Sequence, residues 1–270
     1  MTITSPQHPL VKQARAFKRS RAAVSKSGLF PVEGARALRE ALAAGAVCRT
    51  VLCSQAFAEQ PAGRAFLDWA AGRGIRPRIL ATRLYASLSL LKAPPGVMGF
   101  LEVPTENPVL PLDRPRGLFL LLQGVQDPTN VGAVIRVAAA AGADGLWGLT
   151  GTANPYNPRT IRTAAGTLFR LPFRHGGVLA AAIADLHAAR VAVAALTPRG
   201  DEPYTALQAD RTWALLLGPE GEGLTEAQLQ CADRRVSIPM REGIESLNVA
   251  TAAAVVCFDL ARRRGGGDAP

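Results

Sequence analysis

The second half of the chain alternates short apolar runs with segments whose apolar residues recur at helical spacing. Residues 117–125 (GLFLLLQGV) form an almost continuous apolar run, which is typical of a parallel strand covered on both faces. Similar runs predict strands at 145–150, 191–196, 212–218 and 234–240, and helical spacing predicts helices at 130–142, 158–169, 178–190, 225–232 and 248–264. This repetition predicts an α/β fold, a parallel sheet with helices on both faces.

The first hundred residues show the same alternation over shorter elements. Residues 30–45 (FPVEGARALREALAAG) predict a short strand and then a helix with Ala37, Leu38, Ala41 and Leu42 on one face. Further strands are predicted at 48–54, 77–81 and 96–103, and a further helix at 61–72. These elements predict a small α/β domain in front of the larger one.

A proline-rich stretch without periodicity, residues 103–117, separates the two halves. We therefore expect a first domain over residues 1–105, a linker over 106–116 and a second domain over 117–264. The glycines at 265–267 are expected to stop the last helix and to leave residues 265–270 as a loose tail.

The formal net charge of +10 is concentrated before this linker. Residues 1–100 hold 15 of the 31 basic residues but only four of the 21 acidic ones. No acidic residue occurs among the first thirty, where the basic ones are Lys12, Arg15, Lys18, Arg19, Arg21 and Lys26. This asymmetry favours binding of a polyanion such as RNA by the first domain, the alternative being a solvated basic surface without a partner.

Other classes of protein are disfavoured. No stretch of about 18 apolar residues lacks a charge, which argues against a membrane span, and the basic N-terminus has no apolar signal core. The four cysteines include no pair at CxxC spacing, so a zinc site would need ligands from scattered positions. We expect a cytoplasmic protein with reduced cysteines and no metal.

One predicted helix carries a charge in an apolar setting. Between Val131 and Ala143, Arg136 is the only residue that is neither apolar nor glycine. Its guanidinium must pair, face a cleft or extend to solvent, because burying it unpaired is costly. Asn130 stands where an N-cap is expected, and Thr129 could serve instead.

Two loops after apolar strands also carry polar residues. In LLLGPEGEGL, residues 215–224, the glycines let a ligand approach the backbone, while Glu220 and Glu222 disfavour a phosphate. The loop lacks the dinucleotide and P-loop fingerprints, so the sulfonium of S-adenosylmethionine fits better, the alternative being a plain turn. In IPMREGIESLNVA, residues 238–250, Ser246 and Asn248 open the last helix and could be its caps.

These segments carry a resemblance. DPTNVGAVIRVAAAAG, LLLGPEGEGL and IPMREGIESLNVA resemble the three successive motifs of the SpoU/TrmH family of RNA 2′-O-ribose methyltransferases, over residues 117–262. More weakly, SPQHPLVKQARAF and FPVEGARALREAL resemble the substrate-binding domain, related to RNA-binding ribosomal proteins, of the rRNA-modifying members. The resemblance implies a SPOUT fold, in which the parallel sheet ends in a deep trefoil knot, and a homodimer through the second domain.

The resemblance also assigns site residues. It implies catalytic roles for Asn130, Arg136, Glu220, Ser246 and Asn248. It implies that S-adenosylmethionine binds at Leu196, Gly218, Ile238 and Leu247. Pro219 departs from the family pattern, in which asparagine, alanine or serine is common, but it leaves the glycines and the glutamate of the loop unchanged.

The implied reaction is methyl transfer to a ribose 2′-hydroxyl, with 23S rRNA favoured over tRNA as the substrate. The hydroxyl must lose its proton as the methyl group arrives, and the three motifs contain no histidine to accept it. Arg136 could act as the base, although arginine normally stays protonated, or it could hold the adjacent phosphate and stabilise a forming alkoxide. The alternatives are a tRNA methyltransferase and a non-catalytic knotted RNA-binding protein.

Overall fold

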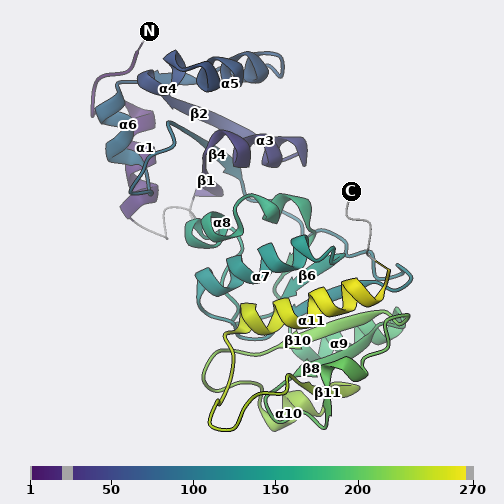
Figure 1. Ribbon diagram of the computed structural model, residues 1–270. Helices are drawn as coiled ribbons and strands as arrows, with labels where there is room; N and C mark the ends of the chain where they lie inside the picture. Colours follow the sequence, from purple (N-terminus) through teal and green to yellow (C-terminus); the bar gives the residue numbers. More distant parts are fainter. Residues whose placement is uncertain (1, 20–26, 266–270) are drawn as a thin grey trace. The chain divides into compact units, whose positions relative to one another are not determined.

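The computed structural model describes residues 2–19 and 27–265, which form two compact units. The first unit comprises the residues up to Thr105 together with Tyr156–Pro158. The second comprises Glu106–Pro155 and the residues from Arg159 onward. Each unit has its own sheet, as Figure 1 shows with the labels of the elements.

The first unit is built on a four-stranded sheet in the order β1-β4-β2-β3. Its strands are β1 (Leu29–Glu33), β2 (Cys48–Ser54), β3 (Arg78–Leu80) and β4 (Val97–Glu102). β4 runs antiparallel to both β1 and β2, while β2 and β3 are parallel. The strands predicted in this half of the chain are therefore confirmed.

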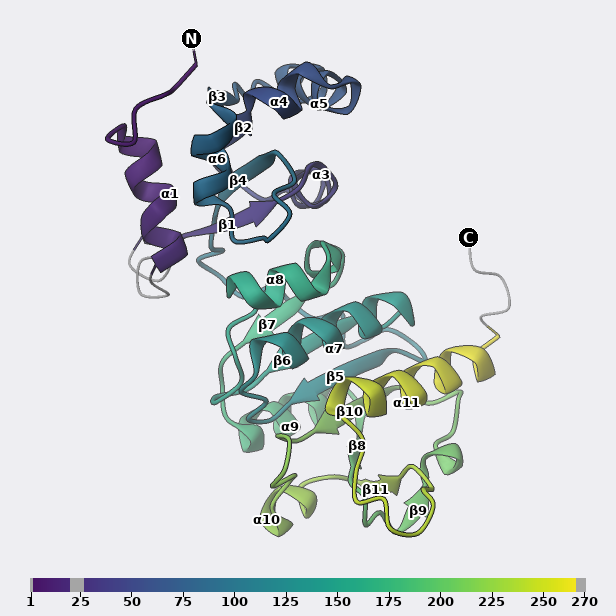
Figure 2. The ribbon, with the colours of Figure 1, turned by 60° about the vertical axis from the view of Figure 1, so that its left-hand side comes forward.

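Helices cover both faces of this sheet (Figure 2). They are α1 (Pro9–Arg19), α3 (Ala35–Ala43), α4 (Gln55–Glu59), α5 (Pro61–Ala71) and α6 (Thr82–Leu88), of which α1, α4 and α6 were not predicted. The rings of Phe17 in α1 and Phe100 have centroids 5.0 Å apart, whereas a Cβ on Gly99 would lie 2.5 Å from Cδ2 of Leu38 in α3. Because neighbouring residues of a strand point to opposite faces, α1 and α3 lie on opposite sides of β4.

The second unit contains a seven-stranded sheet in the order β7-β6-β5-β10-β8-β11-β9, in which every neighbouring pair is parallel. Its strands are β5 (Leu118–Leu122), β6 (Gly145–Gly148), β7 (Phe173–His175), β8 (Ala192–Leu196), β9 (Glu202–Pro203), β10 (Trp213–Leu217) and β11 (Arg234–Ser237). The central strands β5 and β10 are buried along their whole length, as strands covered on both faces must be. The predicted parallel sheet is confirmed.

Helices pack on both faces of the second sheet, as predicted. They are α7 (Pro128–Ala140), α8 (Pro158–Ala164), α9 (Leu179–Ala188), α10 (Glu226–Leu229) and α11 (Val249–Arg263), with 3-10 turns η1 (Thr167–Arg170) and η2 (Tyr204–Ala206). Figure 1 shows α7 and α11 in front of the sheet and α9 behind it. On the α9 side, Ile183 and Leu186 belong to the same buried cluster as Leu121 and Leu216 of the sheet.

Some elements differ in extent from their predictions. The helix predicted over 158–169 breaks after Ala164, because Ala165 and Gly166 adopt left-handed conformations with φ of 51° and 90°. The chain then resumes as η1. The strand predicted over 234–240 stops at Ser237, which is the last residue of β11 that pairs with a neighbouring strand.

Residues 106–116 pack against the second unit. The side chain of Asn107 accepts a hydrogen bond from the backbone N–H of His175 in β7 at 2.8 Å and donates one to its carbonyl at 3.0 Å. Leu110 is buried in the same cluster as Phe119. Arg114 forms an ion pair with Asp144 at 2.6 Å. These contacts place the whole segment on the surface of the second unit.

Candidate functional site

Three neighbouring strands of the second sheet end at the same edge. β10, β8 and β11 are parallel and adjacent, so Leu217, Leu196 and Ser237 close them on one side. Leu196 is only partly buried, as are Gly218 and Ile238, which follow the other two strands. Three of the residues predicted to bind the methyl donor therefore lie at one edge, where ligands of parallel sheets usually bind.

The helix that carries Asn130 and Arg136 begins earlier than predicted. Its N-cap is Asp127, whose carboxylate accepts a hydrogen bond from the backbone N–H of Thr129 at 2.8 Å, and Pro128 lies in the first turn. The predicted capping role of Asn130 is wrong, because Asp127 already supplies the cap. The signal in the sequence was the Asp–Pro pair, since proline is favoured at the first helical position.

Asn130 instead connects the three motifs. Its Nδ2 donates a hydrogen bond to Oε1 of Glu220, and its Oδ1 accepts one from Nδ2 of Asn248 at 3.0 Å. Asn248 in turn caps α11, because its Oδ1 accepts from the backbone N–H groups of Ala250 and Thr251. These bonds join the start of α7, the loop after β10 and the start of α11 at one place.

This chain of hydrogen bonds runs in one direction. A side-chain amide donates through its nitrogen and accepts through its oxygen, so the chain leads from the N-terminus of α11 through Asn248 and Asn130 to Glu220. The positive end of the α11 dipole therefore lies where this chain of hydrogen bonds starts, and the carboxylate of Glu220 lies where it ends. Glu220 is exposed, so its negative charge is also accessible to a cationic ligand.

Two glycines let the loops at this edge pass closely. A Cβ on Gly218 would lie 2.8 Å from Cγ of Leu224, and a Cβ on Gly200 would lie 2.3 Å from the carbonyl carbon of Val236. Gly200 belongs to the loop that follows β8, in which the N–H of Thr197 also donates to the carbonyl of Val236 at 3.0 Å. A larger residue at either glycine would push these segments apart.

The other predicted catalytic residues do not join this cluster within the part of the chain that the structure describes. Arg136 is exposed and follows Asn130 by six residues, which places it roughly 120° away around the axis of α7. Of the possibilities for its guanidinium, extension to solvent is the one observed. Ser246 and Leu247 are also exposed, in the segment that precedes α11.

Four of the predicted RNA-binding residues, Lys12, Arg15, Lys18 and Arg19, lie on α1. The helix turns one apolar face inward, where Val11, Ala14 and Phe17 are buried. The basic residues occupy the rest of its surface, and these are the exposed Lys12 and Lys18 and the half-buried Arg15. The ammonium group of Lys18 also donates to the carbonyl of Ser87 at 3.0 Å. The side chain of Arg19 and all of Arg21 and Lys26 lie outside the described residues.

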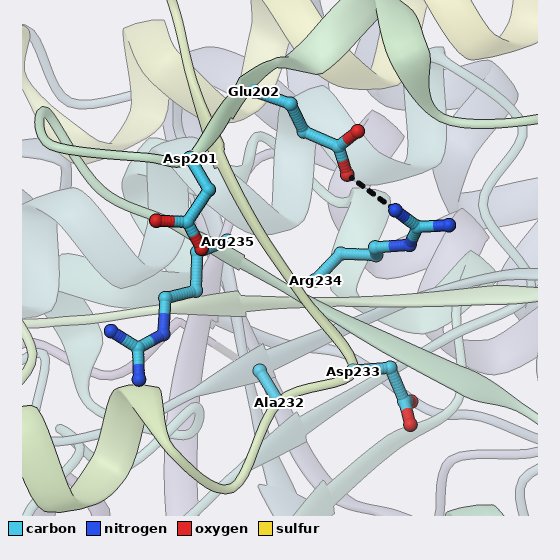
Figure 3. Close-up of a pocket in the computed structure, with 6 residues that line it drawn as sticks. All are labelled: Asp201, Glu202, Ala232, Asp233, Arg234 and Arg235. Atoms are coloured by element: carbon cyan, nitrogen blue, oxygen red, sulfur yellow. Dashed lines mark hydrogen bonds and ion pairs between the residues drawn. The ribbon is translucent and has the colours of Figure 1, made fainter.

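A cavity of about 280 Å³ lies elsewhere in the second unit (Figure 3). It is lined by Asp201, Glu202, Ala232, Asp233, Arg234 and Arg235. Both arginines are paired, since Arg234 contacts Glu202 at 3.3 Å and Arg235 contacts Glu226 at 2.9 Å. Arg234 opens β11 whereas Ile238 follows its end, so this cavity is not the predicted donor site.

Within residues 2–19 and 27–265, no three His, Cys, Asp or Glu side chains gather as possible metal ligands. The helices of those same ranges include none that is long and apolar enough to cross a membrane. The four cysteines are free thiols, in agreement with the sequence-based prediction.

Known proteins resemble both halves of the chain. The profile of the SpoU rRNA Methylase family matches residues 117–258, and that of the MRM3-like substrate binding domain matches residues 8–99. The chain is 29% identical to the 23S rRNA (guanosine(2553)-2′-O)-methyltransferase RlmP of Bacillus subtilis, over 87% of this chain and 90% of that protein.

Solved structures share the fold along almost the whole chain. The SpoU methyltransferase AviRb from Streptomyces viridochromogenes, in complex with the cofactor AdoMet, superposes with a TM-score of 0.82 and 28% identity, over 97% of this chain and 100% of that one. The AdoMet-bound rRNA methyltransferase from Sinorhizobium meliloti superposes with a TM-score of 0.83 and 26% identity, over 97% of each chain.

Proposed function

The chain belongs to the SpoU rRNA Methylase family, and from this premise we propose that it methylates a ribose 2′-hydroxyl of large-subunit (23S) rRNA. It is an RNA ribose methyltransferase that uses S-adenosylmethionine. The observation that carries the proposal is the hydrogen-bonded chain from Asn248 through Asn130 to Glu220, because it assembles the three motifs at one place.

The carboxyl edge of the second sheet suits S-adenosylmethionine. Leu196 and Ile238 offer partly exposed apolar surface to an adenine ring, and the loop backbones beside them offer hydrogen-bonding groups. Glu220 adds a carboxylate that favours a sulfonium over a phosphate. We assign the donor to Leu196, Gly218, Ile238 and Leu247, where, when bound, it supplies an electrophilic methyl group.

Arg136 is assigned to the RNA. A ribose hydroxyl is a weak nucleophile and must lose its proton during the transfer. A guanidinium that holds the phosphate next to the target nucleotide stabilises the alkoxide that forms while the hydroxyl proton passes to water, and it does so without giving up its own proton. The other possible role, Arg136 as the base, requires a deprotonation that arginine resists. Asn130, Glu220, Ser246 and Asn248 position the loops around the reacting groups.

A second copy of the chain completes the site in this proposal. Arg136 points to solvent on a different side of α7 from Asn130, so it needs a surface outside its own chain to meet a donor. On α11, which packs on α7, Phe258 is 49% exposed and offers an apolar contact. We propose a homodimer through these helices. The deep trefoil knot belongs to the same proposal, and the close passage of Gly200 along β11 supports it.

The choice of 23S rRNA rests on the first unit. The MRM3-like substrate-binding profile covers residues 8–99, and the exposed Lys12 and Lys18 of α1 give this unit charges that suit phosphates. The relative from Bacillus subtilis is named for 23S rRNA. A tRNA substrate is the alternative.

Mapping of ribose methylation tests the proposal. Ribosomal RNA and tRNA from a strain that lacks the protein are incubated with the full chain and S-adenosylmethionine. A 2′-O-methyl group is then located by the resistance of its 3′-phosphodiester to alkaline hydrolysis. One new resistant position in 23S rRNA is expected. Methylation of tRNA alone would transfer the proposal to that substrate, and donor binding without any methyl transfer would favour the non-catalytic alternative.

A further inference from the structure

A tryptophan of the first unit has two guanidinium groups beside its ring. The Cζ of Arg73 is 4.4 Å from the centroid of the Trp69 ring, and the Cζ of Arg39 is 5.4 Å from it. Trp69 is on α5, Arg39 is on α3 and Arg73 follows α5, so helices on the same face of the sheet build this cluster. The ring of Phe66 supports the indole with its centroid 5.7 Å away.

The two cations are not neutralised by carboxylates within the described residues. Arg39 donates to the carbonyl of Ala65 at 3.1 Å, and its buried Nε has no hydrogen-bond partner there. Arg73 donates only to the carbonyl of Trp69, at 3.5 Å. Arg36, one turn before Arg39, is paired with Glu40 but its side chain is 85% exposed. Among the residues that the structure describes, Arg39 and Arg73 thus add positive charge without a carboxylate partner beside the aromatic face of Trp69.

Trp69 also differs from the other two tryptophans of the chain in its exposure. Trp147 and Trp213 are 3% and 2% exposed and donate their ring N–H groups to carbonyl oxygens, so they belong to the core of the second unit. Trp69 is only partly buried. An accessible aromatic ring with arginines around it is the arrangement that binds single-stranded nucleic acid, because bases stack on the ring and phosphates pair with the cations.

We propose that Trp69 is a stacking site for one unpaired base of the RNA substrate. The base lies on the side of the indole that Arg73 covers, and the guanidinium of Arg73 turns to the neighbouring phosphate. The inference rests on the proposed function, since it takes RNA as the substrate. α3 and α1 lie on opposite faces of the sheet, so this contact is separate from that of Lys12 and Lys18.

Tryptophan fluorescence of the full chain tests the proposal, because Trp69 is the accessible one of the three indoles. The probe is a single-stranded RNA of about ten nucleotides, within the usual site size of such surfaces, and the control is the same backbone with abasic positions. If a base stacks on Trp69, the RNA should quench the tryptophan fluorescence and the abasic control should not. The two are compared at equal occupancy of the protein, which is measured by the anisotropy of a label at the 5′ end of each strand. Binding of the RNA without quenching would overturn the proposal.

Variants separate stacking from charge. Trp69→Leu is expected to weaken binding of the RNA roughly ten-fold and to leave the abasic control unaffected, whereas Trp69→Phe keeps a ring and most of the affinity. The proposal is overturned if Trp69→Leu binds the RNA as tightly as the parent does. Thermal melting of both variants shows whether they are folded, and Trp69→Phe provides the comparison that retains a ring. Methylation of rRNA by the parent, measured in parallel, tells failure of this site from failure of the proposed function.

Discussion

The side-chain amide of Asn248 donates a hydrogen bond of 3.0 Å to the side-chain oxygen of Asn130, 118 residues earlier in the chain. The Nδ2 of Asn130 in turn donates a hydrogen bond to Oε1 of Glu220. Neither asparagine can reverse its amide without losing a partner, because Asn248 must offer its oxygen to the first turn of α11. The three loops of the site are thus held in register by donors and acceptors that match in only one orientation.

A change of one partner in the hydrogen bond between Asn130 and Glu220 should lower the activity of the enzyme. An exchange of donor and acceptor between the two partners should restore it. Asn130→Asp places two carboxylates together, so the loop after β10 is expected to shift and turnover to fall about 10²-fold. Glu220→Gln added to Asn130→Asp lets the new amide donate to the new carboxylate, whose second oxygen still accepts from Asn248. Methyl transfer under single-turnover conditions, with donor affinity by calorimetry, measures both effects. A double variant no better than Asn130→Asp would contradict the role of this chain.

Arg136 should matter for catalysis and not for folding. Its side chain is exposed, so Arg136→Ala and Arg136→Lys are expected to keep the melting temperature and the donor affinity of the parent. Turnover is expected to fall about 10²-fold or more in both, because a lysine cannot bind a phosphate with two parallel hydrogen bonds. Near-normal turnover of Arg136→Lys would remove both proposed roles of the guanidinium.

Two inactive variants should complement each other if two copies share each site. Arg136→Ala keeps an intact donor edge, and Asn130→Asp keeps an intact arginine. When the two proteins are mixed, unfolded together and refolded, random pairing is expected to restore activity to roughly a quarter of the parent rate. Each variant treated alone is the control. If the mixture stays as inactive as its components, each chain must use its own Arg136.

The loop after β8 should tolerate no side chain at Gly200. A Cβ there would lie 2.3 Å from the backbone of Val236, so Gly200→Ala is expected to lower the free energy of unfolding by about 2 kcal/mol and to weaken donor binding. Gly142→Ala is the matched control, since it also changes a glycine between elements of the second unit but has nothing within 4 Å and lies outside the assigned donor loops, and its cost is the strain of its φ of 74°, about 1 kcal/mol. Equal donor affinity in the two variants would contradict the prediction that donor binding needs the close contact between Gly200 and β11.

Two buried thiols should make the protein less stable at alkaline pH. Burial raises the pKa of Cys53 and of Cys257 to about 12, from an ordinary value of 9.0. The folded chain then holds these protons at a pH where the unfolded chain releases them, so the free energy of unfolding falls as the pH rises from 9 towards 12. Urea unfolding across this range measures the slope, and the double variant Cys53→Ala, Cys257→Ala should show less of it. A slope unchanged in that variant would assign the effect to other groups.

The second sheet was predicted well because buried parallel strands appear in a sequence as continuous apolar runs, and β5 and β10 are such runs. β7 (FRH) and β9 (EP) were missed because each is short and neither contains an apolar run. α1 was missed for another reason. Its basic residues were interpreted as charge alone, although Val11, Ala14 and Phe17 already recur on one face.

The site was predictable as a set of residues but not as a geometry. The motifs named Asn130, Glu220 and Asn248, and only the fold could show that their side chains bond in that order. The N-cap was misjudged because Asn130 is a good capping residue by type, while the chain begins its helix at the Asp127–Pro128 pair. The motifs named Arg136 as well without placing it relative to Asn130, and the pitch of an α-helix turns residues six apart away from each other.

The contact between Asn107 and His175 bears on how copies of the chain can meet. β7 is the outermost strand on its side of the second sheet, and its outward-facing backbone groups at His175 are already satisfied by the amide of Asn107. An edge occupied in this way is a poorer template for a strand from another molecule, which is how sheets fuse into aggregates. Strand addition at the β7 edge is thereby disfavoured at His175.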